Sequence, residues 1–80
     1  METYYFAGEN CKPCKECQPL IKKLQDDGIK ITKYIVEYDY LKAAEFCITS
    51  IPTFVKLIDH IEVDRITGMI SEAELREFAS

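Results

Sequence analysis

Apolar residues recur along the chain with two spacings, and these spacings separate strands from helices. Short runs of aromatic and β-branched residues that end at turn residues are typical of buried strands. Apolar residues at steps of three and four lie on one face of a helix. The pattern predicts strands at 4–7, 29–38, 53–58 and 61–67, and helices at 12–27, 41–46 and 71–78. The order is therefore strand, helix, strand, helix, strand, strand, helix.

The two longer helices carry signals at their ends. Asn10 is placed to cap the start of the first helix, because a short polar side chain can accept its free N–H groups. Gly28 is a typical residue just after a last helical turn. Pro19 lies inside the pattern and cannot donate a backbone hydrogen bond, so we expect a kink there. Ser71 and Glu74 form a capping box for the last helix.

The order of elements predicts how the strands pair. Two strands joined by a helix should lie parallel with a right-handed crossover. In the segment 29–38 the β-branched and aromatic residues lie nearly in one run, as in a strand buried on both faces. The last two strands should form a hairpin around Asp59 and His60, with His60 in the solvated turn. The expected fold class is α/β, with a mixed four-stranded sheet flanked by three helices.

Composition and charge narrow the class of protein. Eighty residues make one domain, 1–80, and 48% hydrophobic with 30% charged residues is an ordinary globular composition. Fourteen acidic against ten basic residues give a net charge of −4, which argues against a nucleic-acid partner. No apolar segment approaches membrane-spanning length, and the N-terminus lacks the pattern of a signal peptide. We therefore expect a cytoplasmic protein.

The candidate chemistry lies in Cys11-Lys12-Pro13-Cys14, where the first strand gives way to the first helix. In a reducing compartment, cysteines this close together are usually catalytic or metal ligands. Thiol exchange needs an exposed thiolate, and Cys11 is the better candidate because it would lie at the positive end of the helix. Cys14, one turn further on, should be more buried and should act as the resolving thiol.

Two further cysteines leave other interpretations open. Cys17 lies three residues after Cys14, and together with Cys11 and Cys47 these thiols could ligate zinc or an iron–sulfur cluster. Metal binding is the alternative function. Cys17 and Cys47 could instead be plain core thiols, or one of them an additional resolving or regulatory thiol.

The motif and its surroundings together resemble the thioredoxin superfamily. The matching residues, in order and with compatible spacing, are Pro13, Cys14, Lys15, Pro19, Ile51-Pro52-Thr53 and Gly68. The short length resembles glutaredoxins, whereas the interior of the Cys-Lys-Pro-Cys motif is closer to the thioredoxin type. At two positions the chain departs from thioredoxins: Asn10 stands where they usually have a tryptophan, and Tyr5 where they have a buried acid.

The resemblance implies a thioredoxin-like fold and a thiol–disulfide oxidoreductase that reduces protein disulfides through Cys11 and Cys14. It implies that Pro52 is a cis proline facing the cysteines, whose neighbour Ile51 pairs through its backbone with substrate; the alternative is an ordinary proline that starts an edge strand. Lys12 and Pro13 would also contact substrate. The expected partners are disulfide-containing proteins, such as ribonucleotide reductase, and a reductase or glutathione as electron donor. We expect a monomer with no cofactor.

Overall fold

The structure is a computed structural model that describes all residues, Met1–Ser80. Its elements follow the predicted order. They are β1 (Glu2–Ala7), α1 (Lys12–Asp26), β2 (Ile31–Ile35), α2 (Tyr40–Glu45), β3 (Thr53–Ile58), β4 (Ile61–Thr67) and α3 (Glu72–Ala79). No helix is long and apolar enough to cross a membrane.

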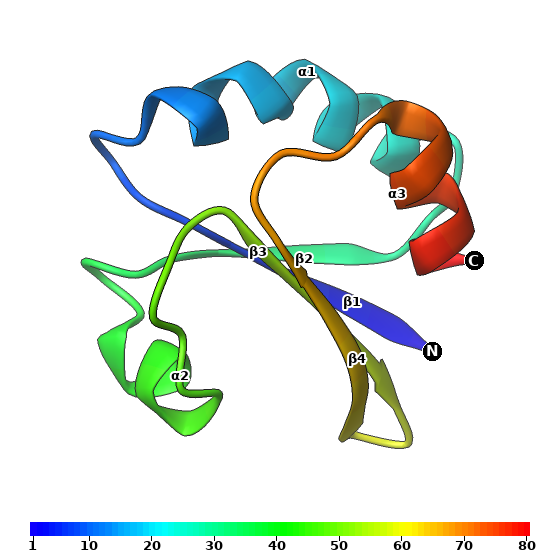
Figure 1. Cartoon of the computed structure of the whole chain (residues 1–80). Coiled ribbons are helices and arrows are strands. Elements are labelled where there is room, and N and C mark those ends of the chain that lie inside the picture. Colours follow the sequence, from blue (N-terminus) through cyan, green and yellow to red (C-terminus); the bar gives the residue numbers. More distant parts are fainter.

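The four strands form one mixed sheet in the order β2-β1-β3-β4. β1 runs parallel to β2 and antiparallel to β3, and β3 runs antiparallel to β4. Helices α1 and α3 lie on one face of this sheet and α2 lies on the other (Figure 1). The start of α1, the loop before α2 and the start of β3 all lie at the same end of the sheet (Figure 1). The predicted mixed four-stranded sheet is confirmed.

Two predictions about the strands were wrong. β2 ends at Ile35 rather than near residue 38, because the Asp39 carboxylate accepts the Ile35 N–H at 2.9 Å and the Asp39 N–H donates to the Ile35 carbonyl at 2.7 Å. These bonds close a turn where the strand was expected to continue. β2 is also an edge strand in which only Ile31 is buried, so it is not covered on both faces. The strand after Pro52, in contrast, is an inner strand between β1 and β4.

A glycine determines where α1 ends. Gly28 has φ +91°, a left-handed conformation in which glycine meets no steric penalty. The Gly28 N–H donates to the Gln25 carbonyl and the Ile29 N–H to the Leu24 carbonyl, so the helix ends in a Schellman motif. Pro19 lies inside α1, which continues to Asp26; a kink at Pro19 stays a prediction.

Short-range signals at the other turns are confirmed. The Ser71 hydroxyl accepts the Glu74 N–H, and the Glu74 carboxylate accepts the Ser71 N–H, which completes the capping box of α3. Asp59 and His60 join β3 to β4 with positive φ at both residues, as a two-residue hairpin turn of type I′ requires. His60 is exposed there.

The two faces of the sheet bury hydrophobic clusters of unequal size. On the face covered by α1 and α3, eleven buried residues pack together, and Cys11 and Cys14 are among them. On the face covered by α2, the cluster has four buried residues: Phe6, Ala43, Val55 and Leu57. The cysteine motif is therefore anchored in the larger part of the core.

Candidate redox site

Cys11 and Cys14 are joined by a disulfide at the start of α1, with their Cα atoms 5.2 Å apart. The Cys14 N–H donates to the Cys11 sulfur at 3.2 Å, so Cys11 itself caps the helix. The prediction that Asn10 is the cap was wrong. The thiol-derived sulfur takes over that role, and Pro13 in the first turn has no N–H that would need a partner. The same N–H would stabilise negative charge on Cys11 once the disulfide is reduced.

Both cysteines are buried in the disulfide form. Cys11 is 9% exposed and Cys14 2% exposed, so the expectation that Cys14 is the more buried of the two is confirmed. The expectation of an exposed Cys11 was wrong for the disulfide form. Lys12 and Pro13, between the two cysteines, are exposed and available to a partner. Neither Lys12 nor Lys15 forms an ion pair, and both side chains are exposed.

The peptide bond between Ile51 and Pro52 is cis, as the resemblance implied. The Thr53 hydroxyl donates to the Ser50 carbonyl at 2.7 Å, and the Gly68 N–H donates to the Pro52 carbonyl at 2.8 Å. These bonds fix the loop before β3 to the end of β4. Ile51 packs against the cluster that contains both cysteines.

Gly8 allows the cysteine loop and the proline loop to approach each other. A Cβ atom at Gly8 would collide with Ile51 Cδ1 and would lie 3.6 Å from both Cys11 Cβ and Glu37 Oε1. The end of the Ile51 side chain occupies this space, so a larger residue at position 8 would force that side chain to move. Gly8 therefore brings Ile51, Cys11 and Glu37 into one site, although the sequence pointed to it only as a turn residue.

Tyr5 contacts the cysteine motif from within the core. Its side chain is fully buried, is stacked on Phe54 with ring centroids 5.0 Å apart, and donates its hydroxyl to the Cys14 carbonyl at 3.0 Å. Burial, with a smaller effect from nearby Cys17, raises the pKa of Tyr5 to about 12. Tyr5 is thus a neutral hydrogen-bond donor at physiological pH. Sequence comparison marked the position as unusual but did not predict this contact.

A second contact to the cysteine loop was missed by sequence reasoning. The Glu9 N–H donates to the Glu37 carboxylate at 3.3 Å, and the Tyr38 hydroxyl donates to the Glu9 carboxylate. The bond to Glu9 raises the pKa of Tyr38. Glu9 and Glu37 are 28 positions apart in the sequence, and Glu9 and Tyr38 are 29 positions apart. No local sequence pattern predicts these two contacts.

The remaining thiols do not join the disulfide in a metal site. Cys17 is buried, as expected for a core thiol, and burial, followed by the charge of Glu16, raises its pKa. Cys47 is exposed at φ +52°, where it forms the left-handed residue of a Schellman motif after α2, so its interpretation as a core thiol was wrong. The structure contains no group of three or more Cys, His, Asp or Glu side chains arranged to hold a metal ion. The four thiols of the metal-binding alternative are not brought together.

The fold and this cysteine geometry define a thioredoxin-type dithiol–disulfide protein. The family model described as Thioredoxin matches residues 4–80, and the chain belongs to the thioredoxin family. Among curated proteins, it is 32% identical over 66 residues to the thioredoxin of Chlamydia caviae. It is 33% identical over 66 residues to the TPR repeat-containing thioredoxin TDX of Arabidopsis thaliana. Each match covers 80% of this chain; the chain spans 65% of the chlamydial protein and 17% of the plant protein.

Solved structures agree on the fold. The thioredoxin of Fasciola hepatica superimposes with a TM-score of 0.87 at 32% identity, over 96% of this chain and 75% of that one. A mutant thioredoxin of Halobacterium salinarum superimposes with a TM-score of 0.89 over 96% of this chain and 69% of that one. At 22% identity, this second similarity concerns the fold alone.

Proposed function

We propose that this chain is a thiol–disulfide oxidoreductase that reduces protein disulfides by cycling Cys11 and Cys14 between dithiol and disulfide. One observation carries the proposal: a disulfide at the start of α1 whose Cys11 sulfur accepts the Cys14 N–H. A sulfur held in this way can leave as a thiolate when the disulfide opens and can attack again as a nucleophile. Membership of the thioredoxin family supports the same activity.

The reaction starts from the reduced chain. The Cys11 thiolate attacks one sulfur of the partner disulfide, so a bond forms between Cys11 Sγ and the partner while the partner's second sulfur leaves as a thiolate. The helix N-terminus and the Cys14 N–H stabilise the Cys11 thiolate before the attack. In our proposal the backbone beside the cis Ile51–Pro52 bond holds an extended partner segment next to Cys11, and Lys12 and Pro13 contact it from the exposed first turn of α1.

The second step releases the partner. Cys14 loses its proton and attacks Cys11 Sγ, which forms the intramolecular disulfide and expels the partner's remaining thiolate. The partner has gained two electrons and takes up two protons, while the chain has lost two electrons. A donor must then reduce the Cys11–Cys14 disulfide. The two cysteines carry the electrons themselves, so the cycle needs no bound cofactor.

The identity of the partners extends the proposal. Disulfide-containing proteins and a reductase are the partners that the family suggests. Ribonucleotide reductase is our specific candidate for a substrate, and glutathione is the alternative electron donor. We place the reaction in the cytoplasm, because an exposed free thiol such as Cys47 is better tolerated in a reducing compartment. We also propose that the chain acts as a monomer.

Serine substitutions test the proposed roles, with reduction of insulin disulfides by dithiothreitol as the assay. We expect Cys11→Ser to abolish catalysis. Cys14→Ser that is first reduced, freed of dithiothreitol and then mixed with insulin should accumulate a mixed disulfide through Cys11, visible by mass spectrometry. Cys47→Ser removes an exposed thiol outside the site and should retain full turnover. The reverse pattern for Cys11 and Cys14 would overturn their roles, and full activity of both variants would overturn the proposed function.

The electron donor can be assigned in a separate assay. The oxidised chain is incubated with NADPH and either a thioredoxin reductase or glutathione with glutathione reductase, and NADPH consumption is followed. We expect faster reduction by the thioredoxin reductase because the motif interior is of the thioredoxin type. Faster turnover with glutathione would instead support the glutathione-dependent route.

A further inference from the structure

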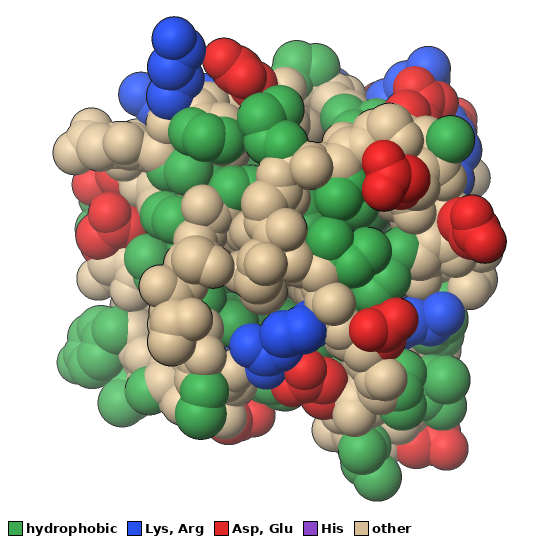
Figure 2. Space-filling view, in the orientation of Figure 1, with side chains coloured by type: hydrophobic (Ala, Val, Ile, Leu, Met, Phe, Trp, Pro, Cys, Tyr) green, Lys and Arg blue, Asp and Glu red, His purple; other side chains and the backbone are tan.

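An exposed apolar patch lies next to the cysteine loop and has no role in the thiol exchange described above. The patch consists of Tyr40 and Leu41, whose side chains are 65% and 75% exposed, and Tyr38, 67% exposed, borders it. Large apolar side chains that gather on a surface mark sites of interaction more often than single exposed ones do. In Figure 2, hydrophobic side chains gather at the lower left, over α2.

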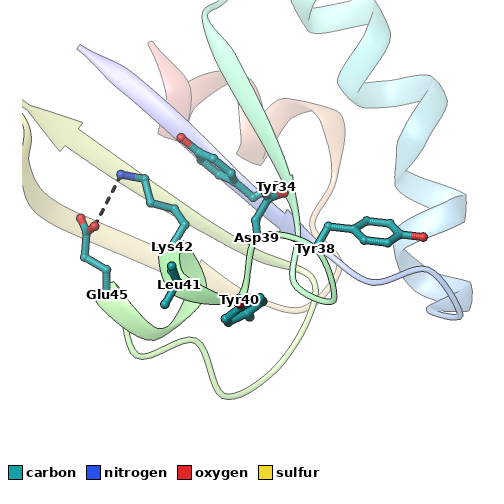
Figure 3. Close-up of a pocket in the computed structure, with 7 residues that line it drawn as sticks. All are labelled: Tyr34, Tyr38, Asp39, Tyr40, Leu41, Lys42 and Glu45. Carbon is teal, nitrogen blue, oxygen red and sulfur yellow. Dashed lines mark ion pairs between the residues drawn. The ribbon is translucent and has the colours of Figure 1, made fainter.

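The patch borders an open hollow of about 480 Å³. This volume falls in the range of about 300–1,000 Å³ that is common for binding sites. Figure 3 shows Tyr40, Leu41 and Lys42 on α2, with Tyr38 directed away from them. The lining residues are Tyr34, Tyr38, Asp39, Tyr40, Leu41, Lys42 and Glu45. The hollow can receive an apolar side chain of a partner.

Negative charge surrounds the patch. Asp39 lines the hollow with Glu45, whose charge Lys42 offsets, while Glu9 and Glu37 lie on its cysteine side through their contacts with Tyr38 and with each other; Asp39, Glu9 and Glu37 form no ion pair. The one cation in the lining is Lys42. Its ammonium pairs with Glu45 at 3.6 Å and lies 5.5 to 5.9 Å from the ring centroids of Tyr4, Tyr34 and Phe46, so it is already engaged within the chain. The surface is complementary to a basic partner.

The patch is continuous with the redox site. Tyr38 donates its hydroxyl to Glu9, which stands two residues before Cys11 in the same loop. Glu37, adjacent to Tyr38, accepts the Glu9 N–H and lies beside Gly8. A partner segment whose disulfide reaches Cys11 can therefore extend over Tyr38 onto Tyr40 and Leu41.

We infer that this patch is a docking surface for the disulfide-bearing protein partner, which places an aromatic or aliphatic side chain flanked by Lys or Arg on Tyr40 and Leu41. The inference rests on the proposed function and adds the chemistry by which the partner is recognised. Charge complementarity would speed association, and burial of the apolar side chain would slow dissociation.

Two synthetic peptides test the inference. Each carries one cysteine in a mixed disulfide with 2-mercaptoethanol. Downstream of the cysteine, one peptide has Lys-Phe-Lys and the other, of the same length, has Glu-Ser-Glu. The rate constant kcat/KM is measured for both peptides and for hydroxyethyl disulfide, a neutral small substrate. The variant is Tyr40→Ser/Leu41→Ser, and the matched control is Ile61→Ser/Val63→Ser, which removes similarly exposed apolar side chains from β4.

The wild type should reduce the basic peptide about tenfold faster than the acidic one, the size expected when an interface loses a central contact. Tyr40→Ser/Leu41→Ser should lose the part of this preference that the apolar contact contributes, with an unchanged rate on hydroxyethyl disulfide, and should keep the part that the acidic residues contribute; the β4 control should keep the whole preference. The preference should also shrink as salt rises from about 0.01 M to about 1 M, which shortens the screening length from about 30 Å to about 3 Å.

Other results would overturn the docking surface. Equal rates for the two peptides, or a preference of undiminished size in Tyr40→Ser/Leu41→Ser, would contradict it. So would a wild-type dimer, found by analytical ultracentrifugation, that this variant dissociates, because the patch would then bind a second copy. If insulin is not reduced at all, the proposed function fails. The surface is then judged by fluorescence anisotropy of the same peptides with cysteine replaced by serine, where the same tenfold preference is expected.

Discussion

The two faces of the sheet have different roles. The face under α1 and α3 buries eleven residues in one cluster, and the disulfide is part of it. The face under α2 buries only four, and around them Tyr4, Tyr34 and Phe46 form an aromatic group that Lys42 covers. α2 itself has six residues and leaves Tyr40 and Leu41 exposed. The reactive sulfurs are thus held by the larger core, whereas the proposed recognition surface lies over the smaller one.

This difference separates chemistry from specificity. A redox pair must keep its geometry through a cycle in which its own covalent bond opens, so a position in the large cluster is an advantage. A surface that contacts a partner must stay accessible, and it can change without loss of the core. Substitutions on the two faces should therefore affect different measurements.

The largest effect is expected from Leu24→Ala, which truncates a fully buried side chain in the larger cluster. The lost burial and the resulting cavity should lower the free energy of unfolding by about 2–5 kcal/mol. Leu41→Ala, an exposed leucine on α2, should change it by less than about 0.5 kcal/mol. Urea unfolding followed by circular dichroism measures both. Similar losses in the two variants would contradict the division between the faces.

Tyr5→Phe tests the buried phenol through the pH dependence of the free energy of unfolding. The folded pKa of about 12 lies above the value of 10 expected for an unperturbed tyrosine, so the contribution of Tyr5 is intact below pH 10 and is lost as the pH rises towards 12. This loss amounts to about 3 kcal/mol. At neutral pH the variant should be less stable by about 1 kcal/mol, because it lacks the hydrogen bond to the Cys14 carbonyl.

The comparison is made by urea unfolding of both proteins from pH 8 to pH 11.5. The advantage of the wild type should shrink above pH 10 and then reverse. Parallel curves over this range would show that Tyr5 is not a buried neutral phenol in solution.

Gly8→Ala should damage the site more than the fold. The added methyl group collides with Ile51, and such overpacking costs about 1–3 kcal/mol. Displacement of the Ile51 side chain beside Cys11 should lower kcat/KM for insulin reduction by up to about tenfold. Gly28→Ala is the control: φ +91° makes it strained, but no atom lies within 4 Å of the added Cβ and it lies at the far end of α1. An equal loss of activity in both variants would show that Gly8 has no specific role at the redox site.

The smallest effect is expected from Cys47→Gly. A residue other than glycine at φ +52° is strained by about 1–2 kcal/mol, and glycine would relieve this strain. The greater conformational freedom of glycine in the unfolded chain offsets part of this stabilisation. The net stabilisation should be about 0.5–1 kcal/mol, measured by thermal unfolding, with unchanged insulin reduction. A loss of activity would instead assign Cys47 a part in the redox cycle.

Sequence reasoning succeeded where the signal is local. Hydrophobic spacing predicted all seven elements, and short motifs predicted the Ser71 capping box, the glycine end of α1 and the hairpin turn at His60. The resemblance added the cis geometry at Pro52. In each case the deciding residues lie within a few positions of one another or belong to a motif of fixed order.

It failed where a side chain finds a partner that the local pattern does not name. The Asp39 carboxylate ends β2 early by taking the Ile35 N–H, and the Cys11 sulfur replaces Asn10 as helix cap. Apolar spacing predicts a strand or a helix but not which polar group will stop it. The bond between Glu9 and Glu37 could not be predicted because it depends on how two distant loops meet.

The central claim is that Cys11 and Cys14 form one reversible two-electron pair. The most direct measurement equilibrates the chain in dithiothreitol buffers of graded redox potential, alkylates the free thiols after unfolding, and locates them by mass spectrometry. The account predicts a single transition in which Cys11 and Cys14 change together while Cys17 and Cys47 stay free throughout. A transition that involves Cys17 or Cys47, or a stoichiometric metal released when the thiols are alkylated, would contradict it.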